Sequence, residues 1–394
     1  MPPPSQQTKR DIRYAHVKQL AGLDVREPLG APKGPQSDDS PTPDELLPII
    51  LGWINDNPAA IKAAKEAQCT STSSTTPNWD TVFFTLVESV GMYLRKEEDV
   101  AQAILAARAG DYDRAITHLE ASEVLIHELA KALDCTFIQL CDFADRGPDG
   151  QERSSGAYAG LFTSNNADKP FVGVAFKGSS SERDTWTDLN WKPIVPLRPD
   201  VAWGSQMHGG FYFNLFGDFT DAVEGVKIPF EVLLEQLSNA YSIGAKLHIT
   251  GHSLGGGLCT LAYGEFLRRE AEPVFAQFSL GDLYSFAAPR VCYQPFADEI
   301  NRRTQPASGR YSFRIVNKQD PVTVMPPPAP PLAIVEDYPF IHVGGAWRIT
   351  GDGPEKMADE PPLVAPPPWD QIIAAAVDHD TRGYYASWQT TPHS

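Results

Sequence analysis

The pattern G-H-S-L-G at residues 251–255 constrains the fold of this chain most strongly, because it lies between a strand-like run and a helical pattern. A serine in a sharp strand-to-helix turn projects its hydroxyl above a sheet, and small flanking residues let strand and helix approach closely. The glycines at 255–257 each cost about 1 kcal/mol against alanine at a helix start, so we infer that close approach requires them. The pattern predicts a nucleophile turn at Ser253. The alternative is a glycine-rich turn whose serine only caps the helix.

The chain after Cys135 alternates short β-rich runs with longer helical patterns. Such alternation implies right-handed crossovers and a mostly parallel sheet covered by helices on both faces. The predicted fold class is therefore α/β. We expect strands at 136–140, 171–176, 246–250, 283–286 and 311–316, and helices at 254–269 and 295–303.

The chain before residue 135 differs in composition and in the spacing of its apolar residues. Residues 1–43 are rich in Pro, Gly, Ser and Gln, which predicts a flexible leader that buries little of itself. Residues 44–134 place apolar side chains at steps of three, four or seven, which predicts helices broken near 70–77 and 110–111. We expect three parts: the leader at 1–43, a helical N-terminal region at 44–134 packed on the core, and the core at 135–394.

Composition excludes several classes of function. With 33 basic and 50 acidic residues the formal net charge is −17, and no basic stripe is present, so nucleic acid is not an expected partner. No apolar run approaches the roughly 18 residues that cross a bilayer. Three prolines follow Met1 without an apolar signal segment, so we expect a cytoplasmic protein, or a secreted one only if this sequence is a processed form. Five cysteines without a C-x-x-C pair predict free thiols and no zinc site.

The residues around the nucleophile turn resemble a known family. Residues 251–256 look like the nucleophile motif of the class 3 lipases, the fungal triacylglycerol lipases and their feruloyl-esterase relatives. Four more segments resemble that family in the same order, and the resemblance covers 135–385: an oxyanion strand at 174–180, an H-x-G-F element at 208–211, an F-G-x-P-R segment at 285–290 and an acid loop at 317–322. It implies an α/β-hydrolase fold, to which the helical pattern at 44–134 adds a helical N-terminal extension. The first 130 residues show no motif of the family.

A serine nucleophile needs a histidine that accepts its proton and a carboxylate that orients the histidine. In α/β-hydrolases these follow in the order Ser, Asp, His. Asp320 lies on a turn after the strand predicted at 311–316, and the resemblance implies that it is the triad acid. The alternative is a turn aspartate that caps its own backbone.

Several histidines are candidates for the base. His379, in D-H-D-T-R-G-Y, resembles the family's C-terminal D-H-x-x-Y element, although the tyrosine comes later here. We predict that His379 is the catalytic base. His342 lies in a strand-like run and resembles a structural segment of the family. His248 and His252 are expected to be packing residues.

An ester carbonyl under attack develops an oxyanion, which needs preorganised donors. One donor is expected to be the backbone N–H of Leu254, favoured by the helix dipole. The resemblance implies that Ser179 is the other. Lys177 stands where the family more often has arginine, so a bidentate pairing at that position is in doubt.

Residues 180–190 align with the family's mobile lid. Trp186 and Leu189 lie three residues apart, so a short helix could present both to lipid or to the cleft. The alternative is a solvated helix with one anchoring tryptophan. The remaining tentative substrate contacts are His208, in the H-x-G-F element, and Met325, in a proline-rich loop whose alternative role is a stiff connector.

These features together predict a serine carboxylic-ester hydrolase that cleaves acylglycerol-type or other lipid esters and needs no cofactor or metal. A feruloyl-type or phospholipid esterase on the same scaffold is an alternative. A second alternative is a lipase-like interaction protein without turnover. The expected partner is a small-molecule or lipid ester, with transient contact at a lipid interface as an option, and the sequence does not indicate an oligomeric state.

Overall fold

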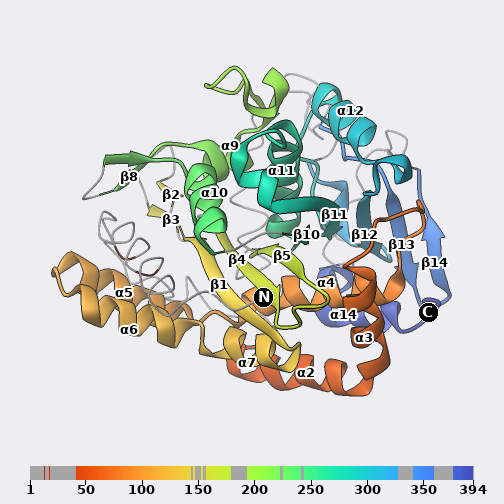
Figure 1. The fold of residues 1–394 in the computed structure, drawn as a ribbon, viewed down its shortest axis with the longest axis horizontal. Helices are drawn as coiled ribbons and strands as arrows, with labels where there is room; N and C mark the ends of the chain where they lie inside the picture. The colour runs from red at the N-terminus through yellow and green to blue at the C-terminus, as the bar shows by residue number, and fades with distance from the viewer. Residues whose placement is uncertain are drawn as a thin grey trace.

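The computed structural model describes residues 13, 17, 41–142, 145–146, 152–153, 157–178, 193–221, 225–240, 244–326, 340–358 and 376–393. An eight-stranded sheet crosses the molecule in the order β1-β4-β5-β10-β11-β12-β13-β14 (Figure 1). Its strands are β1 (Cys135–Asp142), β4 (Tyr158–Ser164), β5 (Phe171–Phe176), β10 (Ala245–His252), β11 (Phe278–Phe286), β12 (Ser312–Asn317), β13 (Ala346–Thr350) and β14 (Gly353–Lys356).

The five central strands, β5 and β10 to β13, run parallel to one another. Antiparallel strands flank them, with β1 and β4 at one edge and β14 at the other. The expected α/β architecture is confirmed, and all five predicted strands are present with ends shifted by a few residues. The sequence did not predict β4, β13 and β14. Glycine interrupts the β-rich pattern of β4, and β14 is a short edge strand that contains a proline, so neither has a clear period.

The helical N-terminal region has more breaks than its periodicity predicts. It forms α2 (Pro43–Asp56), α3 (Pro58–Ala67), α4 (Trp79–Gly91), α5 (Glu97–Arg108), α6 (Tyr112–Ser122) and α7 (Val124–Ala132). The unpredicted break between α2 and α3 falls where Asn57 leaves the helical region just before a proline. Another falls at Arg95, whose backbone is extended after the short helix η1 (Met92–Leu94).

Helices cover both faces of the sheet, and each face has its own hydrophobic cluster. One face carries α9 (Gly209–Phe216), α10 (Pro229–Ala240), α11 (Leu254–Arg268) and α12 (Gln294–Arg303). The other carries α2, α3, α4, α7 and the last helix, α14 (Thr381–Trp388), as Figure 1 shows. Every residue of α4 is buried, so this helix is part of the core of the molecule. The division into a separate N-terminal region stays a prediction.

Five residues of the predicted leader are described, at 13, 17 and 41–43, and two of them make contacts inside the protein. Val17 is fully buried in a cluster with α5 and α6. Arg13 lies 2.6 Å from a carboxylate oxygen of Glu123, which is itself buried. The expectation that the leader buries little is therefore wrong at these two positions, because a buried carboxylate needs a partner of opposite charge.

Among the described residues, three small two-stranded sheets lie apart from the central sheet. They are β2 (Asp145–Arg146) with β3 (Glu152–Arg153), β6 (Pro193–Ile194) with β7 (Met207–His208), and β8 (Phe219–Asp221) with β9 (Gly225–Lys227). Across the part of the chain that the structure describes, no helix is both long enough and apolar enough to span a membrane.

Candidate active site

The predicted nucleophile turn joins the end of β10 to the start of α11. Ser253 has a φ of 60° and a ψ of −126°, a backbone conformation that L residues rarely adopt and that is typical of strained functional turns. A Cβ on Gly251 would meet the backbone oxygen of Gly255, and a Cβ on Gly255 would meet that of Phe176. Only glycine at both positions allows the helix to start so close to the strands, which explains the G-x-S-x-G pattern.

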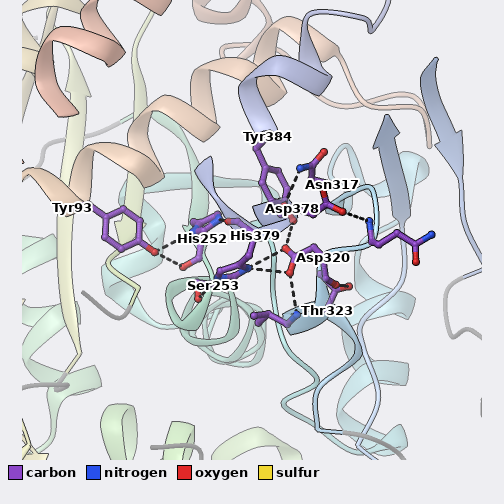
Figure 2. A network of polar contacts seen from close by, with 11 residues as sticks. Tyr93, His252, Ser253, Asn317, Asp320, Thr323, Asp378, His379 and Tyr384 are labelled. Atoms are coloured by element: carbon purple, nitrogen blue, oxygen red, sulfur yellow. Dashed lines mark hydrogen bonds and ion pairs between the residues drawn. The ribbon is translucent and has the colours of Figure 1, made fainter. Parts of the chain in front are cut away.

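The structure brings Ser253, His379 and Asp320 into one chain of hydrogen bonds (Figure 2). Ser253 Oγ lies 2.9 Å from His379 Nε2. His379 Nδ1 lies 3.0 Å and 3.1 Å from the two carboxylate oxygens of Asp320. All three residues are at most 6 % exposed. A carboxylate only accepts, so Nδ1 carries the proton and Nε2 is left to accept from the serine hydroxyl.

Asp320 receives two further hydrogen bonds. The backbone N–H of Val322 donates to Oδ1 at 3.0 Å, and the Tyr384 hydroxyl donates to Oδ2 at 2.7 Å. Burial, followed by the charge of Asp320, raises the pKa of Tyr384 well above its usual value, so this hydroxyl stays protonated. In this sequence, the tyrosine of the D-H-x-x-Y element is Tyr384, which comes later than in the family's pattern. Tyr384 lies in α14, and this helix places its hydroxyl against Asp320.

The loop that carries His379 is held by side chains from the end of β12. Asn317 Nδ2 donates to the backbone oxygen of Asp378 at 2.8 Å and its Oδ1 accepts from Ser387 Oγ at 2.7 Å. His379 itself ends a short helix, η6 (Ala376–His379). Asn317 is the first residue of the acid-loop motif that the sequence indicates. Its contact with the loop that carries His379 is visible only in the structure.

The N-terminal helices hold the helix that follows His379. The indole N–H of Trp388, in α14, donates to the backbone oxygen of Trp79 at 2.7 Å. The rings of Phe83 and Trp388 stack with centroids 4.2 Å apart, and those of Trp53 and Tyr385 stack at 4.5 Å. The helical N-terminal region therefore supports the end of the chain that carries the predicted base.

His248 and His252 both have polar partners. His248 Nε2 lies 2.6 Å from Glu88 Oε2 in the buried core. His252 lies between Tyr93 and the backbone oxygen of His379. His248 and His252 are buried, as expected of packing residues, and each also makes polar contacts, because a buried imidazole requires hydrogen-bond partners.

The alternating pattern around His342 predicts a strand. In the structure, His342 lies outside any strand. Only its neighbour Ile341 makes an isolated bridge, to Cys292. The Nε2–H of His342 donates to the backbone oxygen of Thr323 at 2.8 Å, within the turn that follows Asp320. Burial, followed by nearby arginines, lowers the pKa of His342 well below its usual value, so a neutral imidazole supports the acid loop.

The predicted oxyanion donors are only partly described. Leu254 begins α11, and the first N–H groups of a helix have no acceptor within it. Ser179 lies outside the described residues, as do Trp186 and Leu189 of the predicted lid. Lys177, at the end of β5, lies 2.7 Å from the carboxylate of Glu97 in α5.

The remaining candidates are described, but their roles stay predictions. His208 is fully buried, and its ring meets Phe211 edge to face and lies against Phe340. Burial lowers the pKa of His208 to about 3. Met325 is buried after the short helix η5 (Pro321–Val324). Among the residues that the structure describes, no group of three or more His, Cys, Asp or Glu side chains is arranged to hold a metal ion.

Comparison with known proteins finds lipases. The model of the family Lipase (class 3) matches residues 173–329. A lipase of Rhizomucor miehei is 29 % identical over 184 residues, which cover 47 % of this chain and 43 % of the relative. A secreted mono- and diacylglycerol lipase of Fusarium solani is 29 % identical over 178 residues, covering 45 % of each chain.

Solved structures of lipases are also similar. A triacylglycerol lipase described as having a serine protease triad matches with a TM-score of 0.40 and 21 % identity over 66 % of this chain and 82 % of its own. Lipase II from Rhizopus niveus matches with a TM-score of 0.39 and 17 % identity over 79 % and 95 % of the two chains. The match to the curated relatives spans less than half of their length. The segment that matches the Lipase (class 3) model, residues 173–329, contains both Ser253 and Asp320 and is similar to the lipases of that family.

Proposed function

We propose that this protein is a serine carboxylic-ester hydrolase that cleaves acylglycerol-type or other lipid esters through an acyl-enzyme on Ser253. The observation that carries the proposal is the buried chain of hydrogen bonds from Ser253 through His379 to Asp320, at a strained turn between strand and helix. Relatives named as lipases support the choice of an ester over an amide. The net charge of −17 suits an uncharged substrate.

In the first half of the reaction, Ser253 Oγ attacks the ester carbonyl carbon while its proton moves to His379 Nε2. Asp320 stabilises the imidazolium that forms, because both of its oxygens lie within 3.1 Å of Nδ1. The carbonyl π-electrons move to oxygen, and the N–H of Leu254, with a donor at Ser179, stabilises this oxyanion. The tetrahedral intermediate then collapses, and His379 protonates the departing alcohol.

In the second half, water replaces the alcohol. His379, neutral again, removes a proton from water as the water oxygen attacks the acyl carbon. Collapse of the second tetrahedral intermediate breaks the bond to Ser253 Oγ, which recovers its proton from the imidazolium. The products are a carboxylic acid and the free enzyme, so no redox group or metal ion enters the balance.

A fluorophosphonate probe tests the nucleophile directly, since it reacts only with an activated serine. The wild-type protein should be labelled at Ser253, and Ser253→Ala should lower kcat for p-nitrophenyl butyrate by at least about 10³ while the protein stays folded. Ser312→Ala is the matched control, because Ser312 is a buried serine at the opposite end of β12 from the acid loop. It should keep both labelling and turnover. A wild-type protein that resists the probe would favour the non-catalytic interaction protein.

A substrate panel tests the ester class. Acylglycerols of graded chain length, p-nitrophenyl esters, feruloyl esters and phospholipids should be compared by kcat/KM at equal enzyme concentration. We expect acylglycerols and simple alkyl esters to be hydrolysed best. A preference of more than about tenfold for feruloyl esters or phospholipids would replace the lipase proposal with one of these activities on the same catalytic residues.

A further inference from the structure

Tyr93 reaches the candidate active site from a part of the chain that shows no family motif. It lies in η1, directly after the buried helix α4. Its hydroxyl oxygen is 3.0 Å from His252 Nδ1, and His252 Nε2 is 3.1 Å from the backbone oxygen of His379. Figure 2 shows this chain of contacts on the side of His379 away from Asp320.

The direction of each hydrogen bond follows from the groups involved. A backbone carbonyl can only accept, so Nε2 of His252 carries a proton and donates it to the carbonyl of His379. Burial, followed by the proximity of His379, holds the pKa of His252 well below its usual value, so the ring has only this one proton. Nδ1 is therefore an acceptor, and the Tyr93 hydroxyl donates to it. The other tautomer of His252 would lose the hydrogen bond to the carbonyl of His379, because its Nε2 would have no proton to donate.

A neutral His252 also suits the proposed reaction. The rings of His252 and His379 have centroids 4.9 Å apart. During catalysis His379 gains a positive charge, and a second charge on His252 would oppose it. His252 is only 3 % exposed, and it lies edge to face with Tyr384 at 5.4 Å. The surroundings of His252 therefore keep a rigid, uncharged ring beside the base.

The segment around Tyr93 also contacts the residues that follow β5. A Cβ on Gly178, just after β5, would meet the Tyr93 hydroxyl and would lie 2.7 Å from the backbone oxygen of His252. Four residues after Tyr93, Glu97 forms its ion pair with Lys177. The segment 93–97 thus holds the ends of β5 and β10 together, where the predicted oxyanion strand meets the nucleophile turn.

We propose that Tyr93 is a positioning residue for the base. Its hydroxyl donates to Nδ1 and fixes the ring of His252, and the Nε2–H of His252 then holds the backbone of His379 so that the imidazole of His379 stays between Ser253 and Asp320. This inference rests on the proposed function only for its effect on turnover. The tautomer of His252 is a property of the protein that can be measured without a substrate.

The kinetic test is Tyr93→Phe, which removes one hydroxyl and keeps the ring. Loss of one buried hydrogen bond predicts a kcat roughly 3- to 10-fold lower, with KM changed less than about twofold. Tyr263→Phe is the matched control, because the Tyr263 hydroxyl also makes a buried hydrogen bond, to the backbone oxygen of Gly281 at 2.7 Å. It should keep kcat while lowering the melting temperature by a similar amount. Equal kcat values for wild type and Tyr93→Phe would overturn the proposal.

A double-mutant cycle separates positioning from a general loss of stability. In His252→Gln the donor is an amide N–H, and no imidazole ring remains for Tyr93 to hold. Adding Tyr93→Phe to this background should change kcat by less than about twofold, whereas it lowers kcat in wild type. An equal loss in both backgrounds would mean that Tyr93 acts by another route and would contradict the proposal.

NMR of protein labelled with ¹⁵N-histidine reads the tautomer itself. His252 is one of nine histidines and can be assigned by its absence in His252→Gln. The wild-type protein should show His252 protonated at Nε2 with a hydrogen bond to the unprotonated Nδ1, and Tyr93→Phe should shift the Nδ1 resonance to that of a nitrogen without a hydrogen bond. A wild-type His252 protonated at Nδ1 would overturn the inference. A protein that shows the expected tautomer but hydrolyses no ester would leave this contact intact and refute the proposed function instead.

Discussion

Replacing Asp320 by asparagine should reverse the tautomer of His379, the proposed base. The carboxylate accepts the Val322 N–H on one oxygen and the Tyr384 hydroxyl on the other. The Val322 N–H can only donate, so the amide oxygen of the substituted side chain must face it. The Tyr384 hydroxyl can rotate and accept, so the amide NH₂ takes the other side. That NH₂ group then donates to His379 Nδ1, and the single proton of the imidazole moves to Nε2.

A proton on Nε2 faces Ser253 Oγ, where the base needs a lone pair. We expect a loss of about 10³ to 10⁴ in kcat, equivalent to about 4 to 5 kcal/mol of transition-state stabilisation. KM should change little, because the substitution is isosteric and buried away from the substrate. The measurement is steady-state hydrolysis of p-nitrophenyl butyrate, with the melting temperature recorded for each variant.

Asp380→Asn is the matched control for this substitution. Asp380 is the neighbour of His379 in sequence, and its side chain caps α14 by accepting the backbone N–H of Arg382 at 2.7 Å. Asparagine caps helices as well as aspartate does, so turnover and stability should both stay near wild type. If Asp320→Asn keeps more than one tenth of wild-type kcat with an unchanged melting temperature, the tautomer reasoning is refuted.

Three further predictions concern the surroundings of the site. Burial alone would raise the pKa of Glu123, but Arg13 and His127 together outweigh it and lower that pKa from 4.5 to about 2. Up to about 3 kcal/mol of stability should thus be present above pH 4.5 and lost as pH falls from 4.5 to about 2, an effect that urea unfolding should show in wild type but not in Glu123→Gln. Gly178→Ala places a methyl group against the Tyr93 hydroxyl and should lower kcat/KM roughly 10-fold in the ester assay, and unchanged activity would contradict the close approach. Trp388→Ala removes a fully buried indole and should destabilise the protein by about 3 to 5 kcal/mol in urea unfolding, whereas a loss below about 1 kcal/mol would contradict its role as an anchor of α14.

The sequence was most informative where local backbone geometry dictates residue type. The spacing of Gly251, Ser253 and Gly255 predicted a strand-to-helix turn, and the structure has β10 ending and α11 beginning there. The order of the family's segments also predicted the acid loop after β12. Both are short-range features, since a side chain at φ 60° or a close approach of two backbones restricts the residues within one turn of it.

The helix boundaries were less predictable, for a related reason. Periodicity marks which residues face a core, but it does not show where a chain must turn to follow that core. The breaks at Asn57 and Arg95 therefore appeared only in the structure. The complete burial of α4 likewise depends on its contact with the central strands, which no pattern within the helix itself specifies.

The family resemblance pointed to His379 as the base, but only the tertiary structure shows its contact with Ser253 and what holds it there. His379 lies 126 residues from Ser253 along the chain, and Tyr93 lies 159 residues from His252. The sequence determined the strand, the turn and the set of candidate acids and bases. Their convergence depends on how helices from both ends of the chain pack on one sheet, because a hydrogen bond between side chains more than a hundred residues apart leaves no period or spacing in the sequence.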